Sequence, residues 1–207
     1  MHRTLLKTTL VLALPALACP AFAQSRGEWA VALGAHQVNP RSDSGTLAGG
    51  TLPVRVDSSV RPTVSLEYFV ADNLGVEVLA ALPFQHGIQI RGLGTVGSTR
   101  QLPPTVSLQY HFNHQGQVSP FLGAGVNYTT FFSEDTRGAL AGSTLALGDS
   151  WGLAAHAGLD FKLGTRGALR VDVRWMDIDS AVRLDGTRLG TAHLDPWIYG
   201  AAYVQMF

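Results

Sequence analysis

The chain has 207 residues, of which 46% are hydrophobic and 14% are charged, with fifteen basic and fifteen acidic side chains. Soluble domains usually carry about 25% charged residues, so this chain is poor in charge. Its neutral balance argues against a nucleic-acid-binding protein, which needs a basic surface for the phosphates, and its single cysteine excludes a disulfide scaffold or a zinc site built on paired cysteines.

The first segment has the features of an export signal. Two basic residues precede an apolar run over residues 10–18, and Ala21-Phe22-Ala23 supplies small residues at the positions that a signal peptidase reads. This order predicts a secretory signal peptide over residues 1–23, cleaved between Ala23 and Gln24. A lipoprotein signal at Cys19 is the weaker alternative. The remaining chain, residues 24–207, has no apolar stretch long enough for a membrane helix.

From residue 29 onward, residues alternate in character with a period of two, as in β-strands whose two faces differ. Short turns and long links alternate strictly between these segments, and the long links fall at residues 38–60, 84–102, 133–149 and 180–194. Because a membrane protein without membrane helices must satisfy its backbone in a closed barrel, the sequence predicts an all-β, eight-stranded antiparallel transmembrane β-barrel with short periplasmic turns and long extracellular loops. The eight segments are 29–36, 62–70, 75–82, 105–112, 122–129, 151–162, 169–176 and 197–207.

Aromatic residues gather near both ends of the predicted strands, where lipid headgroups meet hydrocarbon. Phe207 ends the last strand, which is typical of substrates of the outer-membrane assembly machinery. We therefore expect the protein in the cell outer membrane, with outer-membrane lipid and this machinery as partners. The expected girdles consist of Trp29, Tyr68, Tyr110, Phe112, Phe161 and Tyr203 on the periplasmic side, and Trp151, Trp175 and Trp197 on the outer side.

Charged residues occur on the strand faces expected to point inward. Glu67 and Glu77 are equidistant from Asp72, so their carboxylates should face each other, and the charges at 160 and 162 should oppose those at 170 and 172 across the next short turn. Two close carboxylates could serve acid–base chemistry through a raised pKa. A paired network that plugs the lower lumen is favoured, because a buried charge persists only when paired. Its expected members are Glu67, Glu77, Asp160, Lys162, Arg170, Asp172 and Arg174.

Several stretches, in order along nearly the whole of residues 24–207, resemble the OmpW family of outer-membrane proteins. They include Val38-Asn39-Pro40, Asp72-Asn73-Leu74-Gly75-Val76-Glu77, Leu102-Pro103-Pro104-Thr105, residues 123–132, Asp149-Ser150-Trp151-Gly152-Leu153 and Asp195-Pro196-Trp197. The sequence departs from the family at Gln205, where an aromatic residue is usual. The resemblance implies a porin-like, eight-stranded barrel whose narrow interior, unlike that of a porin, is lined by apolar residues toward its outer end. Such a barrel is expected to pass small hydrophobic molecules and to release them sideways into the membrane.

The long links carry apolar residues that would form an apolar mouth. Eight strands enclose a lumen wide enough only for side chains or one small ligand, so a small hydrophobic ligand or detergent is a better expected partner than bulk water. Inward glycines would leave room beside the mouth, although glycine also permits tight curvature. The mouth candidates are Leu93, Val96, Leu102, Leu140, Leu145, Leu147 and Phe131.

Three further signals carry less weight. Residues 92–97 match the dinucleotide-binding fingerprint, but no helix can follow them, and the histidines lack short metal-ligand spacings. A lipid-modifying hydrolase would need a histidine, at 86 or 193, beside Ser98, Ser150 or Asp195, and no nucleophile motif accompanies them. A structural or receptor barrel whose loops bind a partner is the third alternative. We expect no enzyme activity, no cofactor, no metal and no nucleic acid.

Overall fold

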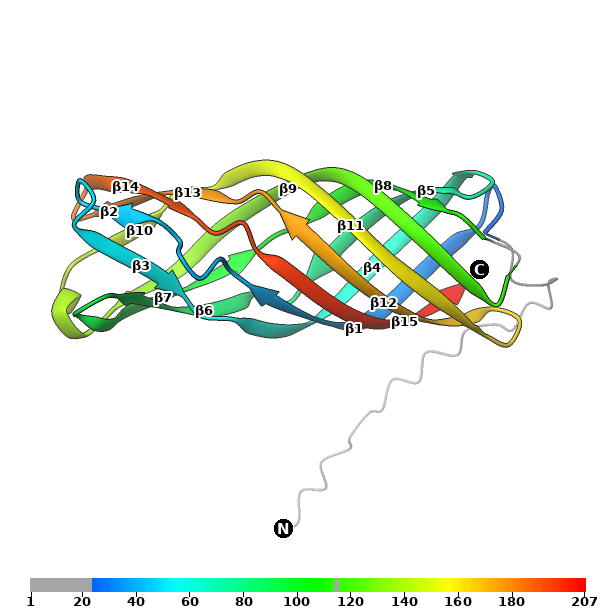
Figure 1. Ribbon diagram of the computed structural model, residues 1–207, viewed down its shortest axis with the longest axis horizontal. Coiled ribbons are helices and arrows are strands. Elements are labelled where there is room, and N and C mark those ends of the chain that lie inside the picture. Colours follow the sequence, from blue (N-terminus) through cyan, green and yellow to red (C-terminus); the bar gives the residue numbers. More distant parts are fainter. Residues whose placement is uncertain (1–23, 114–115) are drawn as a thin grey trace, which may run out of the picture.

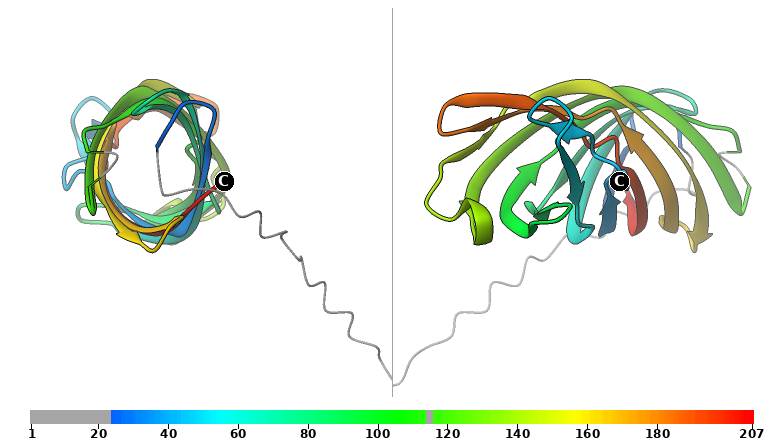
Figure 2. Two further views of the ribbon diagram at one scale, coloured as in Figure 1. Left: turned by 90° about the vertical axis from the view of Figure 1, so that its right-hand side faces the viewer. Right: turned by 60° about the vertical axis from the view of Figure 1, so that its left-hand side comes forward.

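The computed structural model describes residues 24–113 and 116–207, and the predicted signal peptide at residues 1–23 lies outside them. Eight strands close into an antiparallel ring, seen end-on in Figure 2. This confirms the predicted barrel. In ring order the strands are β1 (Trp29–Asn39), β4 (Ser59–Ala71), β5 (Leu74–Ala81), β8 (Thr105–His111), β9 (Val118–Thr136), β11 (Ser150–Leu163), β12 (Gly167–Met176) and β15 (Trp197–Met206), which pairs with β1.

The long links expected as loops are largely strands that continue the wall outward (Figure 1). β6 (Phe84–Ile90) and β7 (Gly94–Leu102) form a hairpin on the outer half of the 19-residue β9, and β2 (Thr46–Leu47) and β3 (Leu52–Val56) extend this sheet. β10 (Leu145–Leu147), β13 (Asp179–Leu184) and β14 (Thr187–His193) form a second sheet beside it. Register shifts at Ile88/Gln89 and Val182/Arg183 break the period of two there, so alternation alone does not reveal these strands.

One helical element occurs in the described ranges, the short 3-10 helix η1 (Gly138–Leu140). Among residues 24–113 and 116–207, no helix is long and apolar enough to cross a membrane.

The two faces of the barrel wall differ in the way that alternation predicts. On β4, Ser65 and Glu67 point inward and are buried, whereas Val64 and Leu66 between and beside them are 43% exposed. The nine expected girdle residues all lie in exposed or partly exposed positions. Neighbouring girdle rings touch across strands, as Trp29 and Tyr68 do with ring centroids 4.7 Å apart. The apolar exterior is what a lipid environment requires.

The lumen is packed in two different ways along its length. Its lower half, near the short turns, holds buried charged and polar side chains together with buried apolar ones such as Phe69, Val204 and Met206. Above them lies a hydrophobic layer formed by Val38, Leu79, Phe84, Phe131, Ala154, Met176, Ile178, Leu194 and Ile198. A second apolar cluster, with Leu47, Val54, Ile90, Val96, Val182 and Ala192, lines the interior of the outer strand extensions.

Candidate functional site

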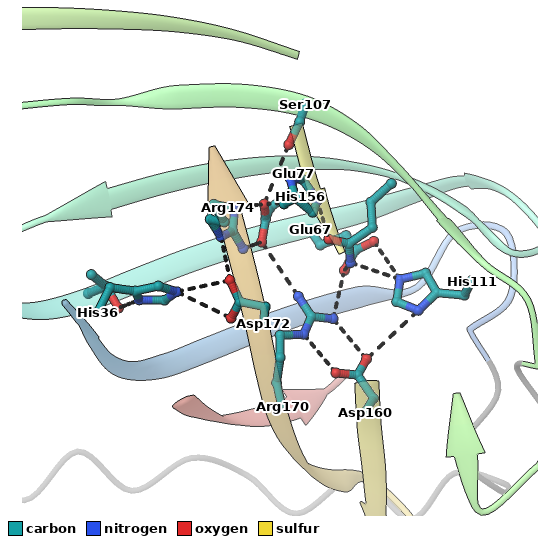
Figure 3. A network of polar contacts seen from close by, with 12 residues as sticks. His36, Glu67, Glu77, Ser107, His111, His156, Asp160, Arg170, Asp172 and Arg174 are labelled. Carbon is teal, nitrogen blue, oxygen red and sulfur yellow. Dashed lines mark hydrogen bonds and ion pairs between the residues drawn. The ribbon is translucent and has the colours of Figure 1, made fainter. Parts of the chain in front are cut away.

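The lower lumen contains a continuous network of ion pairs and hydrogen bonds (Figure 3). Glu67 and Glu77 are opposite each other in the β4–β5 hairpin, and Asp160 and Arg170 are opposite each other in the β11–β12 hairpin. These four residues are at most 2% exposed. The symmetry of each short turn therefore brings these charges to one level of the barrel.

Arg170 joins three carboxylates that come from three strands. Its Nε and Nη2 donate to the two oxygens of Asp160 at 2.7 and 2.9 Å, a bidentate geometry. The same guanidinium donates to Glu67 at 3.4 Å and to Glu77 at 3.5 Å. It also lies 4.5 Å from the ring centroid of Phe121, within the range of a cation–π contact.

Arg174 forms the second centre of the network. Its two terminal nitrogens donate to Glu77 at 2.7 and 3.0 Å, and its Nε donates to Asp172 at 2.7 Å. On the far side of Asp172, His36 Nε2 lies 3.2 Å from both carboxylate oxygens. Each of the four acids is thus paired with a guanidinium, so the geometry does not support an unpaired acid–base dyad.

Histidines and glycines complete the network in a way that the sequence does not reveal. His111 Nε2 lies 2.9 Å from Glu67, and His156 Nε2 lies 2.9 Å from the side-chain oxygen of Gln109. A Cβ at Gly123 would overlap the imidazole of His156, and a Cβ at Gly200 would overlap that of His36. The imidazole rings of His156 and His36 therefore occupy the room left by these inward glycines. The alternating pattern indicates that these residues point inward, but not that they pack on one another.

Gln24 and Lys162 lie at the periplasmic end of the network. Gln24, the first residue of the predicted mature chain, is 1% exposed, and its side chain contacts His111 Nδ1 at 2.8 Å and accepts from the Ser119 hydroxyl at 3.0 Å. Lys162 is buried, but Ala168 stands opposite it in the hairpin. It therefore does not oppose Asp172, whose register partner on β11 is a glycine.

An apolar cavity lies above the hydrophobic layer, between the outer strand extensions. It holds about 680 Å³ of empty space, its mouth included, but it is narrow, because the centre of a water-sized sphere can occupy only about 50 Å³ of it. Mostly apolar walls with a few polar groups are typical of small-molecule sites. The apolar side chains that line it are Leu47, Val54, Val56, Ile88, Ile90, Val96, Phe131, Leu140, Leu145, Leu147, Val182, Leu184, Leu189, Ala192 and Leu194.

Five of the seven expected mouth residues line this cavity, and Leu93 and Leu102 do not. Leu93 is 46% exposed, because it sits at the tip of the β6–β7 hairpin between Gly92 and Gly94, whose φ values are +88° and +73°. Most of the other lining residues, which are absent from the expected mouth, come from β2, β3, β6, β13 and β14. These strands fall in the long links that the sequence predicts as loops.

Four polar side chains also line the cavity: His86, Thr99, Gln101 and Ser180. His86 is opposite Thr99 in the β6–β7 hairpin, and its Nδ1 lies 2.5 Å from the backbone oxygen of Asp57. In the described part of the chain, no serine hydroxyl is within hydrogen-bond distance of either His86 or His193. The geometry therefore provides no activated nucleophile for the hydrolase alternative.

The residues of that alternative are engaged elsewhere. His193 pairs with Asp179 at 2.5 Å, Asp195 pairs with Arg41 at 3.0 Å, and Ser98 accepts from Arg137 at 3.2 Å. Asp177, Asp179 and Asp195 form one acidic group near the outer girdle, with their oxygens within 4.8 Å of one another. Two of these three carboxylates are already ion-paired, so the group carries no argument for a metal.

The barrel wall is interrupted beside the hydrophobic layer. The β5–β8 ladder ends at the pair Leu79–Thr105, and the β6–β7 ladder begins only at Phe84–Gln101. Prolines at 83, 103 and 104 fall in this interval, and they lack the N–H that a ladder needs. A small cavity behind the interruption is lined by Leu79, Ala80, Ala81, Phe84 and Pro103, together with His36, Thr63, Met176 and Ile198.

The chain is similar in sequence and in structure to known outer-membrane proteins. The model of the OmpW family matches residues 25–207. Outer membrane protein W of Escherichia coli (strain K12) is 36% identical over 186 residues, covering 86% of this chain and 88% of that protein. Outer membrane protein AlkL of Ectopseudomonas oleovorans is 31% identical over 194 residues, covering 87% and 83%. The crystal structure of OprG from Pseudomonas aeruginosa superimposes with a TM-score of 0.79 at 31% identity, covering 90% of this chain and 99% of that one.

Proposed function

Because the chain belongs to the OmpW family, and is accordingly a barrel of the Gram-negative outer membrane, we propose that it gives small hydrophobic molecules a passive route through its outer cavity. The observation that carries the proposal is the apolar lining of that cavity, which is built from both outer sheets. An apolar molecule that enters it leaves water without having to displace charged side chains.

The lower lumen argues that this route does not continue straight to the periplasm. Arg170 and Arg174 hold four carboxylates in contacts that span the interior from β4 and β5 to β11 and β12. A hydrophobic molecule passing here would have to separate buried ion pairs, which is strongly unfavourable. The network therefore acts as a plug in this proposal.

The interruption between the β5–β8 and β6–β7 ladders supports a sideways exit. It lies at the hydrophobic layer, directly below the cavity, and no ladder pair closes the wall between Leu79–Thr105 and Phe84–Gln101. Molecules leaving here would enter the apolar part of the bilayer. The proposed route thus runs from the outer cavity through the wall, and it needs no aqueous pore.

The test compares two leucines that the structure separates. Leu147 lines the cavity and packs against both apolar clusters, whereas Leu93 is exposed at a hairpin tip. Burying a leucine side chain contributes about 1.5–3 kcal/mol, so Leu147→Asp should weaken occupancy, and hence uptake of radiolabelled n-octane by intact cells, by about tenfold or more. Leu93→Asp, the matched control, should leave uptake unchanged. Equal uptake by both variants, with each properly inserted in the outer membrane, would overturn the proposal.

Two further assignments accompany the proposed route. We infer that residues 1–23 are removed on export, which is supported by the position of Gln24 inside the lower lumen. Phe207, 48% exposed directly after β15, is proposed as the signal that the outer-membrane assembly machinery reads.

A further inference from the structure

His86 lines the apolar cavity and carries a buried polar atom that has no partner among the described residues. The residue is 1% exposed, and its ring is stacked on Phe84 with an interplanar angle of 24°. Among the described residues, Nε2 of His86 is buried and has no hydrogen-bond partner. Buried polar atoms are nearly always paired, so an unpaired one at a cavity wall points to a group that arrives with a ligand.

The contact at the other ring nitrogen determines what Nε2 can do. Nδ1 lies 2.5 Å from the backbone oxygen of Asp57, and a carbonyl oxygen can only accept, so Nδ1 carries the proton. His86 lies on the outer strand extension and not on one of the eight strands of the ring, and burial there lowers the pKa of His86, which favours the neutral ring. In a neutral ring protonated at Nδ1, Nε2 is an acceptor with a free lone pair.

The neighbouring hydroxyls do not supply the missing donor. Thr99, opposite His86, donates to the backbone oxygen of Arg100 at 3.3 Å, and Ser180 donates to that of Gly148 at 2.8 Å. The rest of the wall near them is aliphatic or aromatic, apart from the amide of Gln101. Among the residues that the structure describes, Nε2 of His86 is therefore an unpartnered acceptor in a mostly apolar wall, with the amide of Gln101 as another polar group near it.

We propose that the cavity selects slender molecules that carry an O–H group on an apolar chain, and that this hydroxyl donates to His86 Nε2. The inference rests on the proposed function and specifies its substrate class. Because a water-sized sphere has only about 50 Å³ in which to move, a linear chain fits better than a branched or fused-ring molecule. A chain without a donor would leave Nε2 unpaired in the complex, which a site built around an acceptor disfavours.

The test uses two isomers that differ only in the donor. Hexan-1-ol and 1-methoxypentane have the same atoms and similar linear shapes, but the ether has no O–H. Each is titrated into the protein in lipid nanodiscs, with empty nanodiscs as the blank, and the backbone amide NMR shifts of Val96 and Leu145 report occupancy of the cavity. We expect the alcohol to bind about tenfold more tightly, equivalent to about 1.4 kcal/mol, which is within the range of one hydrogen bond.

Variants assign that preference to His86. His86→Phe keeps a flat ring and removes the acceptor, so the affinity ratio should fall to about one. His193→Phe, the matched control, makes the same change at a histidine that pairs with Asp179 and does not line the cavity, and should keep the ratio of the wild type. A preference that persists in His86→Phe would overturn the assignment.

The remaining outcomes separate this inference from the proposed function. Equal binding of both isomers by the wild type overturns the selection for O–H groups and leaves the hydrophobic route standing. Absence of shifts with either isomer overturns both. If His86→Phe does not fold, the 15N resonance of His86 Nε2 in the wild type decides, because it should move with hexan-1-ol and not with 1-methoxypentane, and any other result refutes the inference.

Discussion

Replacing Arg170 by methionine is the most direct test of the lower lumen. Methionine is an unbranched, uncharged side chain that is shorter than arginine. The variant loses the guanidinium that lies over Phe121 and four charge-assisted hydrogen bonds, two of them the bidentate pair with Asp160. Removing one partner of a buried ion pair costs about 3–5 kcal/mol, because the other charge remains buried without compensation. The free energy of unfolding of Arg170→Met should fall by an amount in this range.

A double-mutant cycle then separates the pair from the rest of the network. Asp160→Asn removes the partner charge while keeping its shape, so the double variant should be more stable than the sum of the two single losses predicts, by about 1–3 kcal/mol. Equilibrium unfolding by urea in lipid vesicles measures these differences. The four tryptophans, at 29, 151, 175 and 197, report the transition from the girdles by fluorescence.

Two outcomes would refute this reasoning. A loss below about 1 kcal/mol in Arg170→Met would mean that the carboxylates are not held as a buried charged group. Strict additivity in the cycle would mean that Asp160 and Arg170 do not interact energetically, despite separations of 2.7 and 2.9 Å.

Two more predictions follow from the packing around the lumen. Gly200→Ala places a Cβ on the imidazole of His36, so it should displace His36 from Asp172 and lower the urea midpoint of unfolding. Adding His36→Ala to this variant should restore part of the lost midpoint. An unchanged midpoint in Gly200→Ala alone would contradict this packing. Ala81→Phe fills the small cavity behind the wall interruption. Transfer of hexan-1-ol from the outer cavity into vesicle lipid should therefore slow, while binding of hexan-1-ol in nanodiscs persists. An unchanged transfer rate would speak against the sideways exit.

The inward and outward faces of the eight central strands follow from the sequence, because strand geometry imposes a period of two on a wall with different environments on each side. Local symmetry about each short turn likewise yields the pairs Glu67–Glu77 and Asp160–Arg170. The partners across the lumen do not follow, since contacts such as Arg174 with Glu77 join strands far apart in the chain.

Phe121 shows that position along a strand is not enough to place an aromatic ring. It lies near the periplasmic end of a strand, as the girdle aromatics do, but it shares its strand face with Gly123 and is 1% exposed beneath Arg170. The position of Phe121 along its strand predicts a place in the girdle, whereas its phase in the alternation predicts that its ring points into the lumen. The phase determines the direction of the ring. The outer hairpins were missed for a different reason, because bulges interrupt the alternation within them.

The length of β9 has a consequence for the barrier that a hydrophobic molecule meets. Nineteen residues at about 3.4 Å each, tilted by about 40°, give a wall roughly 45–50 Å high, whereas the apolar band of such barrels is about 25 Å tall. About 20 Å of hydrogen-bonded sheet therefore stands outside the hydrocarbon, at the depth of the hydrated and charged headgroups and beyond. On the route proposed above, a hydrophobic molecule inside this wall would cross the headgroup region without dissolving in it, so the wall would remove the barrier that hydrated headgroups pose to an apolar molecule.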